Sequence, residues 1–309
     1  MRDRYRTPAA LDAAISAKAK QVAAAAGTSP GDLVTAFHLQ RLMARVFFQG
    51  EGWMLKGGQS LLVRFPHAAR LSRDVDLFRP DTDDLEQAVE EFGLAVSREI
   101  DDYFRFTRES VAIHDGTAKV KVGVRIGVQR KQPLDVDLIV RRTPIGEPTR
   151  AVLTPTIPVD WPDTWPSVVL YPLVDHLGDK LAAIWERHRR YGRESVASTR
   201  FRDLADALLM AQQAQFDGVE VRKALASEVV RRNALGGVEL TLPAAFEVPD
   251  QVVWAREYPK AAAQVTGLIG CRNLAEAEAA AHRFVDPLLA EQDPGIWDPA
   301  AAEWRPRRP

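Results

Sequence analysis

The sequence predicts an α+β protein of two lobes, with a mixed or antiparallel sheet and its helices first and a mainly helical lobe after it. The chain has 309 residues, 46% of them hydrophobic and 27% charged, which is enough for a large core and near the length at which a second lobe is common. Apolar residues recur at helical spacing near both ends but alternate in the middle. A proline-rich stretch separates the alternating part from the second helical part.

Composition limits the classes of protein. No stretch approaches roughly eighteen consecutive apolar residues, and the N-terminus has no apolar signal core, so we expect a cytoplasmic protein without membrane contact. The single cysteine, Cys271, excludes an intramolecular disulfide and a multi-cysteine zinc site. The formal net charge of −1 means that nucleic acid would need a local basic patch. Arginines between Arg187 and Arg202 are a candidate, with a solvated helix end as the equal alternative.

Residues 1–50 are predicted to form helices that pack on the core. Thr7-Pro8 favours a helix start and Gly27 a stop, and a second start follows at Ser29-Pro30. In the second helix, apolar residues recur at nearly helical spacing, which predicts a supporting element: Leu33, Phe37, Leu42, Val46 and Phe47.

Residues 51–143 are predicted to form the α/β core. A short buried strand at 52–55 leads into a glycine pair, and a helix can begin at Ser60. A second strand is expected at Asp74–Phe78, followed by a helix near 83–100.

Apolar residues then alternate with polar ones. Phe104 and Phe106 mark a strand, and Asp115-Gly116 is typical of a hairpin turn. The next strand is predicted to present one apolar face, formed by Val120, Val122, Val124, Ile126 and Val128.

A partner strand is expected at 134–140, after a connection at 130–133. Because side chains alternate along a strand, Asp135 and Asp137 should lie on the face opposite to its apolar residues.

The remaining chain is predicted to consist of three parts. Residues 144–172 are rich in proline, cannot form regular helix and are expected to be an extended connector. Residues 173–290 have helical patterns and should form the C-terminal lobe, while 291–309 is a tail that we expect to be disordered from Trp304 onward.

The glycine pair is a candidate phosphate-binding turn. Gly57 and Gly58 stand between a predicted strand and a predicted helix, where backbone N–H groups can approach a phosphate closely. Ser60 can add a hydroxyl donor near the helix start.

Acidic residues on the next strand are candidate metal ligands. Asp74 and Asp76 are two residues apart and should project from one face, where their oxygens can hold one or two Mg²⁺ ions. A third carboxylate on a neighbouring strand would complete a two-metal site. We choose Asp137 for it, with Asp135 as the alternative.

Four ordered motifs between about residues 50 and 210 carry a resemblance to a known family. They are Lys56–Leu62, Arg70–Phe78, Tyr171–Leu181 and Ser198–Asp206. They resemble the motifs of the AbiEii/AbiGii group of nucleotidyltransferase-like toxins, which includes mycobacterial MenT-type toxins and belongs to the DNA polymerase beta-type superfamily.

The resemblance implies a role for each matching residue. Ser60 and the two glycines would bind the triphosphate and Lys56 would assist, Asp74 and Asp76 would bind metal, Lys180 would contact phosphate and Asp203 would belong to the catalytic set. Asp203 could orient the lysine or accept a proton, and Arg202 with Asp206 could equally form a structural ion pair. Gln59 departs from the Ser or Thr that the family often has.

The expected function follows from the residues and the resemblance together. We expect a nucleotidyltransferase that uses Mg²⁺, with Mn²⁺ as an alternative, to move a nucleotide from an NTP to an acceptor hydroxyl. The expected acceptor is a tRNA 3′ end, and the expected biological role is that of a toxin with a cognate antitoxin. The alternatives are transfer to a protein or small molecule, or a catalytically silent nucleotide-binding protein.

Overall fold

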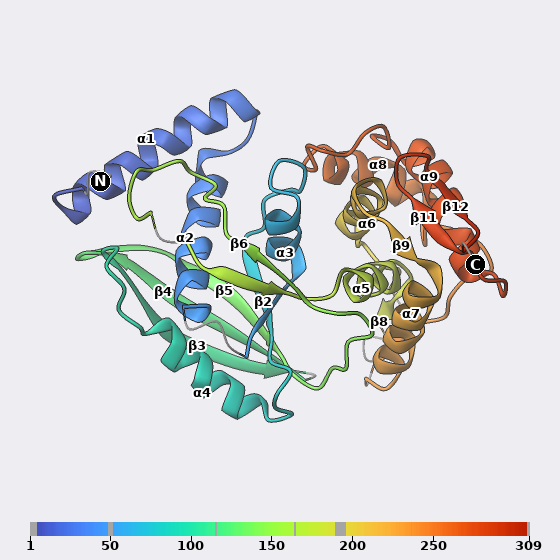
Figure 1. Cartoon of the computed structure of the whole chain (residues 1–309), viewed down its shortest axis with the longest axis horizontal. Helices are drawn as coiled ribbons and strands as arrows, with labels where there is room; N and C mark the ends of the chain where they lie inside the picture. The colour runs from blue at the N-terminus through green and yellow to red at the C-terminus, as the bar shows by residue number, and fades with distance from the viewer. Residues whose placement is uncertain are drawn as a thin grey trace. The chain divides into compact units, whose positions relative to one another are not determined.

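The structure is a computed structural model that describes residues 5–48, 52–114, 116–163, 165–188, 196–235 and 237–307. The chain, whose course is drawn in Figure 1, divides into two compact units. Unit 1 comprises Met1–Pro66, Leu71–Thr143 and Pro148–Tyr171. Unit 2 comprises His67–Arg70, Pro144–Glu147 and Pro172–Pro309.

The N-terminal part of unit 1 forms helices α1 (Pro8–Ala26) and α2 (Pro30–Val46), as predicted. The Thr7 hydroxyl accepts a hydrogen bond from the Ala10 N–H at the start of α1, and Gly27 ends that helix with a φ of +64°. Ser29 caps α2 in the same way as Thr7 caps α1. Capping signals in the sequence therefore located both helices.

A seven-stranded mixed sheet lies at the centre of unit 1, in the order β3-β4-β5-β2-β1-β7-β6. The pairs β2/β5 and β1/β7 are parallel, and the other neighbours are antiparallel. The mixed α+β class is therefore confirmed. Its strands are β1 (Met54–Lys56), β2 (Asp74–Phe78), β3 (Phe104–His114), β4 (Thr117–Ile126), β5 (Gln129–Ile139), β6 (Thr149–Val152) and β7 (Ser167–Leu170).

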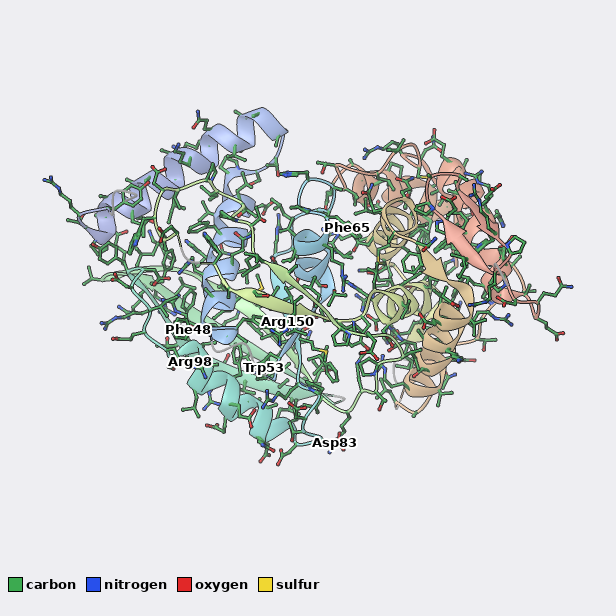
Figure 2. The ribbon with its side chains drawn as sticks, viewed as in Figure 1. Phe48, Trp53, Phe65, Asp83, Arg98 and Arg150 are labelled. Carbon is green, nitrogen blue, oxygen red and sulfur yellow. The ribbon has the colours of Figure 1, made fainter. Side chains whose placement is uncertain are left out.

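One face of this sheet is covered by helices. Helices α1, α2 and α4 (Leu85–Val96) contribute to the same hydrophobic core as the apolar residues of β4 and β5, and Figure 1 shows them beside these strands. Trp53, which is labelled in Figure 2, lies just before β1. It is buried against Phe92 of α4, with the ring centroids 6.2 Å apart. The aspartates of β2 and β5 belong to the face opposite to this core.

The β4–β5 hairpin corrects two expectations. Val120, Val122, Val124 and Ile126 are buried as predicted, but Val128 is 90% exposed. It lies in a two-residue turn with Gly127, whose φ of +58° suits such a hairpin. The connection is therefore shorter than predicted, and residues 129–133 belong to β5.

The proline-rich segment 144–172 is more than a connector. Its described residues contain no helix, as expected, but β6 and β7 within it extend the sheet beyond β1. The prolines flank these strands without interrupting them, so the backbone N–H groups of Ser167–Leu170 remain available for pairing.

Unit 2 is mainly helical. Helix α5 packs against α6 and α7, and α9 packs against α6, α7 and α8. No helix in the described part of the chain is both long and apolar enough to cross a membrane. The helices are α5 (Leu173–Trp185), α6 (Phe201–Gln213), α7 (Gly218–Asn233), α8 (Gln251–Ala262) and α9 (Leu274–Leu289), with short strands β8 (Arg187–His188), β9 (Phe216–Asp217), β10 (Val238–Glu239), β11 (Ile296–Asp298) and β12 (Glu303–Arg305).

The expected disorder of the tail from Trp304 is wrong for its described residues. Strand β12 pairs with β11, and the Trp304 ring stacks on Phe284 of α9 with the centroids 5.6 Å apart. Trp297 of β11 is 3% exposed. Burial of Trp297 and packing of the half-buried Trp304 order the segment despite the charged residues around them.

Candidate functional site

The turn between β1 and α3 (Gly57–Arg64) begins the candidate site. Gly57 has a φ of +63°, in the left-handed region that favours glycine. Lys56 stands at the N-cap position, and its side chain does not cap the helix. The first N–H groups of an α-helix have no partner within the helix and can bind an anion. The turn therefore has the backbone geometry of a phosphate-binding element.

The carboxylate of Asp76 packs directly against this turn. A Cβ atom placed on Gly57 would lie 1.7 Å from Asp76 Oδ2, far inside contact distance. Position 57 must therefore be glycine for two reasons, its backbone angle and the space that Asp76 takes. The glycine turn and the acidic strand meet at this point.

Strand register aligns charged residues in two rows across one face of the sheet. In the first row, Lys56 of β1, Asp76 of β2, Asp137 of β5 and Lys119 of β4 are successive partners. Side chains of directly paired residues share a face of the sheet. The second row is formed by Asp74, Asp135 and Lys121.

Asp135 and Asp137 differ in their surroundings. Asp137 lies opposite Asp76, next to the glycine turn, whereas Asp135 lies opposite Asp74. The Asp135 carboxylate is 68% exposed and pairs with Lys121 at 3.5 Å. Burial raises the pKa of Asp137; Lys119 opposes this shift, and the negative charges of Asp74 and Asp135 add to it. Asp137 thus carries repulsion that a bound cation would relieve.

The carboxylates of this face fit a magnesium ion that arrives with a triphosphate. Asp74, Asp76 and Asp137 offer the hard oxygen ligands that Mg²⁺ prefers. Within the described ranges, no three His, Cys, Asp or Glu side chains are close enough together to hold a metal ion by themselves. Mg²⁺ is usually held by one or two carboxylates, with substrate phosphates and water completing its coordination.

The residues after the glycines connect the helix to the acidic strand. The Gln59 amide donates a hydrogen bond to the Ser72 carbonyl at 3.1 Å, and the Ser72 hydroxyl donates to Asp74 Oδ1 at 2.5 Å. Gln59, which departs from the family pattern, is therefore a positioning residue here. Ser60 is fully buried, and its hydroxyl has no hydrogen-bond partner among the described residues. Such an unsatisfied group is unusual in a folded protein.

Unit 2 holds a second cluster around Lys180. The Lys180 ammonium on α5 lies 2.6 Å from Asp203 Oδ1 and 2.8 Å from Asp206 Oδ2, both on α6. Arg70 reaches the same Asp206 carboxylate with two hydrogen bonds, at 3.1 and 3.2 Å. Spacing of three residues places Asp203 and Asp206 on one face of α6.

The ion pairs of this cluster keep Lys180 and Asp206 charged. Burial alone lowers the pKa of Lys180, but the Asp203 and Asp206 carboxylates outweigh burial, so that the pKa is raised above its usual value. Burial likewise raises the pKa of Asp206, and the Lys180 and Arg70 charges reverse that shift, so the net pKa is lowered. Lys180 is therefore a permanently cationic group held in a fixed direction.

The structure places the predicted site residues in two groups. Unit 1 brings the glycine turn together with the aspartates of β2 and β5, and unit 2 brings Lys180 together with Asp203. Sequence reasoning missed Arg70 and Asp206 as partners in the second group. The suggested Arg202–Asp206 ion pair is wrong, because Asp206 is fully buried against Lys180 and Arg70 while Arg202 is exposed.

The predicted basic patch between Arg187 and Arg202 lies partly outside the described residues. Arg189, Arg190 and Arg193 lie outside the described residues. Of the others, Arg200 is exposed and lies 4.0 Å from Asp203.

Comparison with known proteins gives one family. A family model described as "Nucleotidyl transferase AbiEii toxin, Type IV TA system" matches residues 41–291. No curated protein matches the sequence. Among solved structures, MenT4, a nucleotidyltransferase toxin from Mycobacterium tuberculosis H37Rv, is 19% identical with a TM-score of 0.48, and the match covers 88% of this chain and 97% of that chain.

Proposed function

Because the chain belongs to the AbiEii family of nucleotidyl transferase toxins of type IV toxin–antitoxin systems, we propose that it uses Mg²⁺ to move a nucleotide from an NTP to the 3′ end of a tRNA. The nucleotidyltransferase activity, the NTP and a cognate antitoxin follow from the family. We propose the identity of the metal, the identity of the acceptor and the roles of single residues in the reaction. We further propose that the reaction takes place in the cytoplasm, where NTPs and tRNA meet.

The observation that carries the proposal is the packing of Asp76 against Gly57. The backbone that would bind phosphate and the carboxylate that would bind metal lie in contact, with the Asp76 carboxylate where a Cβ of residue 57 would be. A triphosphate at the start of α3 would thus lie next to the acidic rows. Lys56, partner of Asp76 in the sheet, is 4% exposed and adds positive charge on the same side.

Asp74, Asp76 and Asp137 would hold the metal, with Asp135 as the less favoured alternative. Asp137 is supported by its place opposite Asp76, and Asp135 is already paired with Lys121. When bound, Mg²⁺ supplies acidity to the acceptor hydroxyl and compensates charge on the leaving pyrophosphate. Ser72 would hold the Asp74 carboxylate in place through its 2.5 Å hydrogen bond.

Lys180 would contact the phosphates, and Asp203 would orient it. A fixed cation stabilises the charge that builds on the transferring phosphoryl group, an effect that depends on its position being set in advance. The 2.6 Å and 2.8 Å contacts to Asp203 and Asp206 provide that fixed position. Because both carboxylates are engaged by Lys180, orientation of the lysine accounts for Asp203 better than proton transfer does.

An anionic acceptor is supported by the open face of the sheet. Lys119, Lys121 and Arg125 of β4 are exposed and share the face of the four aspartates, and Arg130 of β5 is the partner of Arg125. Basic side chains along one strand suit the regularly spaced phosphates of a nucleic acid strand. Binding of tRNA through them would weaken steeply as salt increases.

The test is a label-transfer reaction with total tRNA and Mg²⁺. Each NTP is supplied once with label on the α-phosphate and once with label on the γ-phosphate. We expect α-label on tRNA, no γ-label, and no transfer after periodate oxidation of the 3′ hydroxyls or after EDTA is added.

Other outcomes would change the assignment in defined ways. Transfer of γ-label would make the enzyme a kinase. Transfer of α-label to protein but never to RNA would mean that the acceptor is a protein. Transfer that persists in EDTA would contradict the proposed requirement for Mg²⁺.

A further inference from the structure

Strand β3 leaves a long edge of the sheet open. It has 11 residues and stands at the end of the strand order, with β4 as its only neighbour among the described strands. Outside the β3–β4 ladder, no described residue forms a hydrogen bond with the backbone of Ser110–His114. Their outer N–H and C=O groups are therefore available to another strand.

The C-terminal end of this edge, Ser110–His114, lacks the features that usually prevent unwanted strand pairing. Proteins protect open edges with charged residues, proline, bulges or very short strands. A bulge lies between Arg108 and Ser110, but the five residues beyond it, Ser-Val-Ala-Ile-His, contain no proline and no permanently charged side chain. Val111 and Ile113 within them are 38% and 47% exposed.

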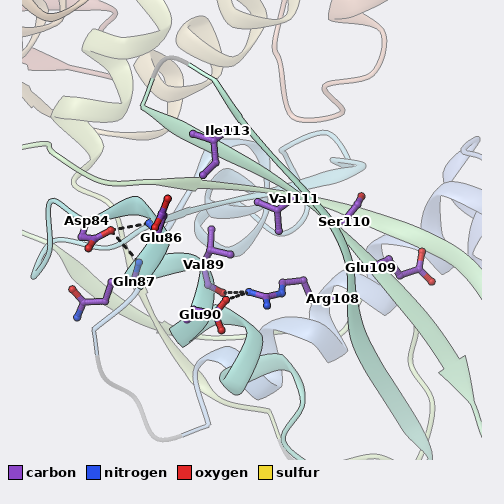
Figure 3. A pocket seen from close by; sticks show the side chains of 10 residues that line it. All are labelled: Asp84, Glu86, Gln87, Val89, Glu90, Arg108, Glu109, Ser110, Val111 and Ile113. Atoms are coloured by element: carbon purple, nitrogen blue, oxygen red, sulfur yellow. Dashed lines mark hydrogen bonds and ion pairs between the residues drawn. The ribbon is translucent and has the colours of Figure 1, made fainter.

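A groove with a volume of about 670 Å³ runs beside this edge, between β3 and α4 (Figure 3). Val111 and Ile113 face it from the strand, and Val89 faces it from the helix. The register pairs Val111 with Val120 and Ile113 with Ala118, whose side chains are buried in the core. The groove is thus the outer end of the core-facing side of the sheet.

The charge around the groove is negative. Its lining includes the carboxylates of Asp84, Glu86 and Glu90 and one guanidinium, that of Arg108. Glu109 also belongs to the lining, but its carboxylate pairs with Arg130 at 2.8 Å and points away from the groove (Figure 3). Arg108 donates to Glu90 at 2.8 Å and to the Val89 carbonyl at 3.2 Å. Asp84 caps α4 through hydrogen bonds from the backbone N–H groups of Glu86 and Gln87, and neither Asp84 nor Glu86 has a cationic partner in the described part of the chain.

We propose that β3 and this groove bind an extended segment of a partner protein that carries lysine or arginine at alternate positions. The segment adds a strand to the sheet by pairing with the open edge of β3. Because side chains alternate, its basic residues all enter the groove, where their methylene stems cover Val111 and Ile113 and their charged ends reach Asp84 and Glu86. This inference is independent of the nucleotidyl transfer reaction.

The acidic lining argues against a second copy of this chain or a nucleic acid as the occupant. In a symmetric β3–β3 dimer the carboxylates of both α4 helices would lie around one interface, and like charges repel. Phosphates would meet the same repulsion. A basic peptide strand satisfies both the open backbone and the charge.

Binding is measured with a labelled probe peptide of alternating lysine and threonine, nine residues long, and the full chain. We expect saturable binding by fluorescence anisotropy, together with slower hydrogen exchange at the amides of residues 110–114. The same peptide with every amide N-methylated has no N–H donors and should not bind, and a glutamate–threonine peptide should not bind either.

Two variants test the two parts of the surface. Glu86→Lys reverses a groove charge and should weaken binding about fivefold or more. Glu147→Lys is its control, because Glu147 is exposed and lies outside the groove lining. Val111→Lys places a charge on the edge and should abolish binding, with thermal melts verifying that each variant folds.

Three results would overturn the proposal. One is equal binding of the N-methylated and unmethylated peptides, which would mean charge attraction without strand pairing. Another is binding that leaves the exchange of residues 110–114 unchanged. The last is self-association of the parent chain that Val111→Lys abolishes, without peptide binding, which would assign the edge to a second copy.

Discussion

At the scale of single residues, Gly57 connects backbone conformation to the proposed metal chemistry. Its φ of +63° and the 1.7 Å approach of Asp76 to its missing Cβ are separate constraints. Any other residue would be strained, and it would also displace the Asp76 carboxylate.

A matched pair of variants separates the two constraints. Gly27 has a φ of +64° and nothing within 4 Å of an added Cβ, so Gly27→Ala pays only the backbone cost of about 1 kcal/mol. We expect Gly57→Ala to lose nucleotide transfer by about 100-fold or more, because Asp76 must move, whereas Gly27→Ala lowers the melting temperature and keeps its transfer rate. Equal transfer rates for the two variants would show that Asp76 does not depend on the turn.

The burial of His38 predicts how the stability of unit 1 depends on pH. The side chain on α2 is 4% exposed, packs edge-on against Phe104 at 5.6 Å, and has no partner for Nε2 among the described residues. Burial, assisted by Lys131 and opposed by Asp12, lowers the pKa of His38 from 6.5 to about 4. Between these pH values His38 is protonated in the unfolded chain but neutral in the folded chain. The free energy of unfolding therefore falls as pH falls from 6.5 toward 4.

We therefore expect His38→Leu to reduce this acid sensitivity. The proton-linked contribution is about 3 kcal/mol for the full shift, from the 1.36 kcal/mol that each pKa unit represents. Urea unfolding at pH 4.5 and pH 7 should give a smaller difference in unfolding free energy for the variant than for the parent. The same difference in both proteins would mean that His38 is protonated in the folded state.

At the scale of secondary structure, strand register gives the two aspartates of β5 different neighbours. Parallel pairing of β2 with β5 places Asp137 opposite Asp76 and Asp135 opposite Asp74. The sequence alone could not choose between Asp137 and Asp135 as the third metal ligand, because both lie on the same face of one strand. Their difference arises from neighbouring strands, since Lys121 pairs with Asp135.

The register predicts unequal effects of two conservative changes. Asp137→Asn should lower nucleotide transfer by about 100-fold or more, because several kcal/mol of metal-dependent stabilisation would be lost. Asp135→Asn should change transfer less than about tenfold, since it removes an exposed ion pair. Initial rates at saturating Mg²⁺ measure both, and the opposite order would make Asp135 the third ligand.

The C-terminal strands offer a test of stability that is separate from activity. Trp304 stacks on Phe284 and donates a hydrogen bond to the Phe284 carbonyl at 3.0 Å. We expect Trp304→Ala to lower the free energy of unfolding by about 2 kcal/mol, less than for a fully buried tryptophan. Glu303→Ala, at a side chain that is 60% exposed, is the control and should change it by less than about 0.5 kcal/mol. A disordered tail would give no change for either variant.

Local signals predicted the elements whose structure is decided locally. Capping residues located α1 and α2, and the apolar alternation located β4 and the outward aspartates of β5. The elements that were misjudged depend on distant partners. Strands β6 and β7 form because β1 is available to pair with β7, and β12 is ordered because Trp304 finds Phe284.

At the scale of the whole molecule, the candidate site could be predicted where its residues are close in sequence. The glycine turn and the aspartates of β2 lie within one short segment, and the sequence predicted that they would lie close together, as Gly57 and Asp76 do. Asp206 was misassigned because its partner Arg70 is 136 residues away, a separation that no local pattern reports. The hydrogen bonds from Gln59 to Ser72 and from Ser72 to Asp74 likewise could be found only from the three-dimensional structure.

The central claim is that this chain transfers nucleotides with carboxylates that meet the glycine turn. Its most direct test is single-turnover transfer of α-labelled NTP to tRNA by the parent, Asp76→Asn and Asp160→Asn, the last at an exposed aspartate elsewhere in unit 1. We predict Mg²⁺-dependent transfer by the parent and by Asp160→Asn, and a loss of at least about 100-fold in Asp76→Asn. Transfer at the parent rate by a folded Asp76→Asn would contradict the account.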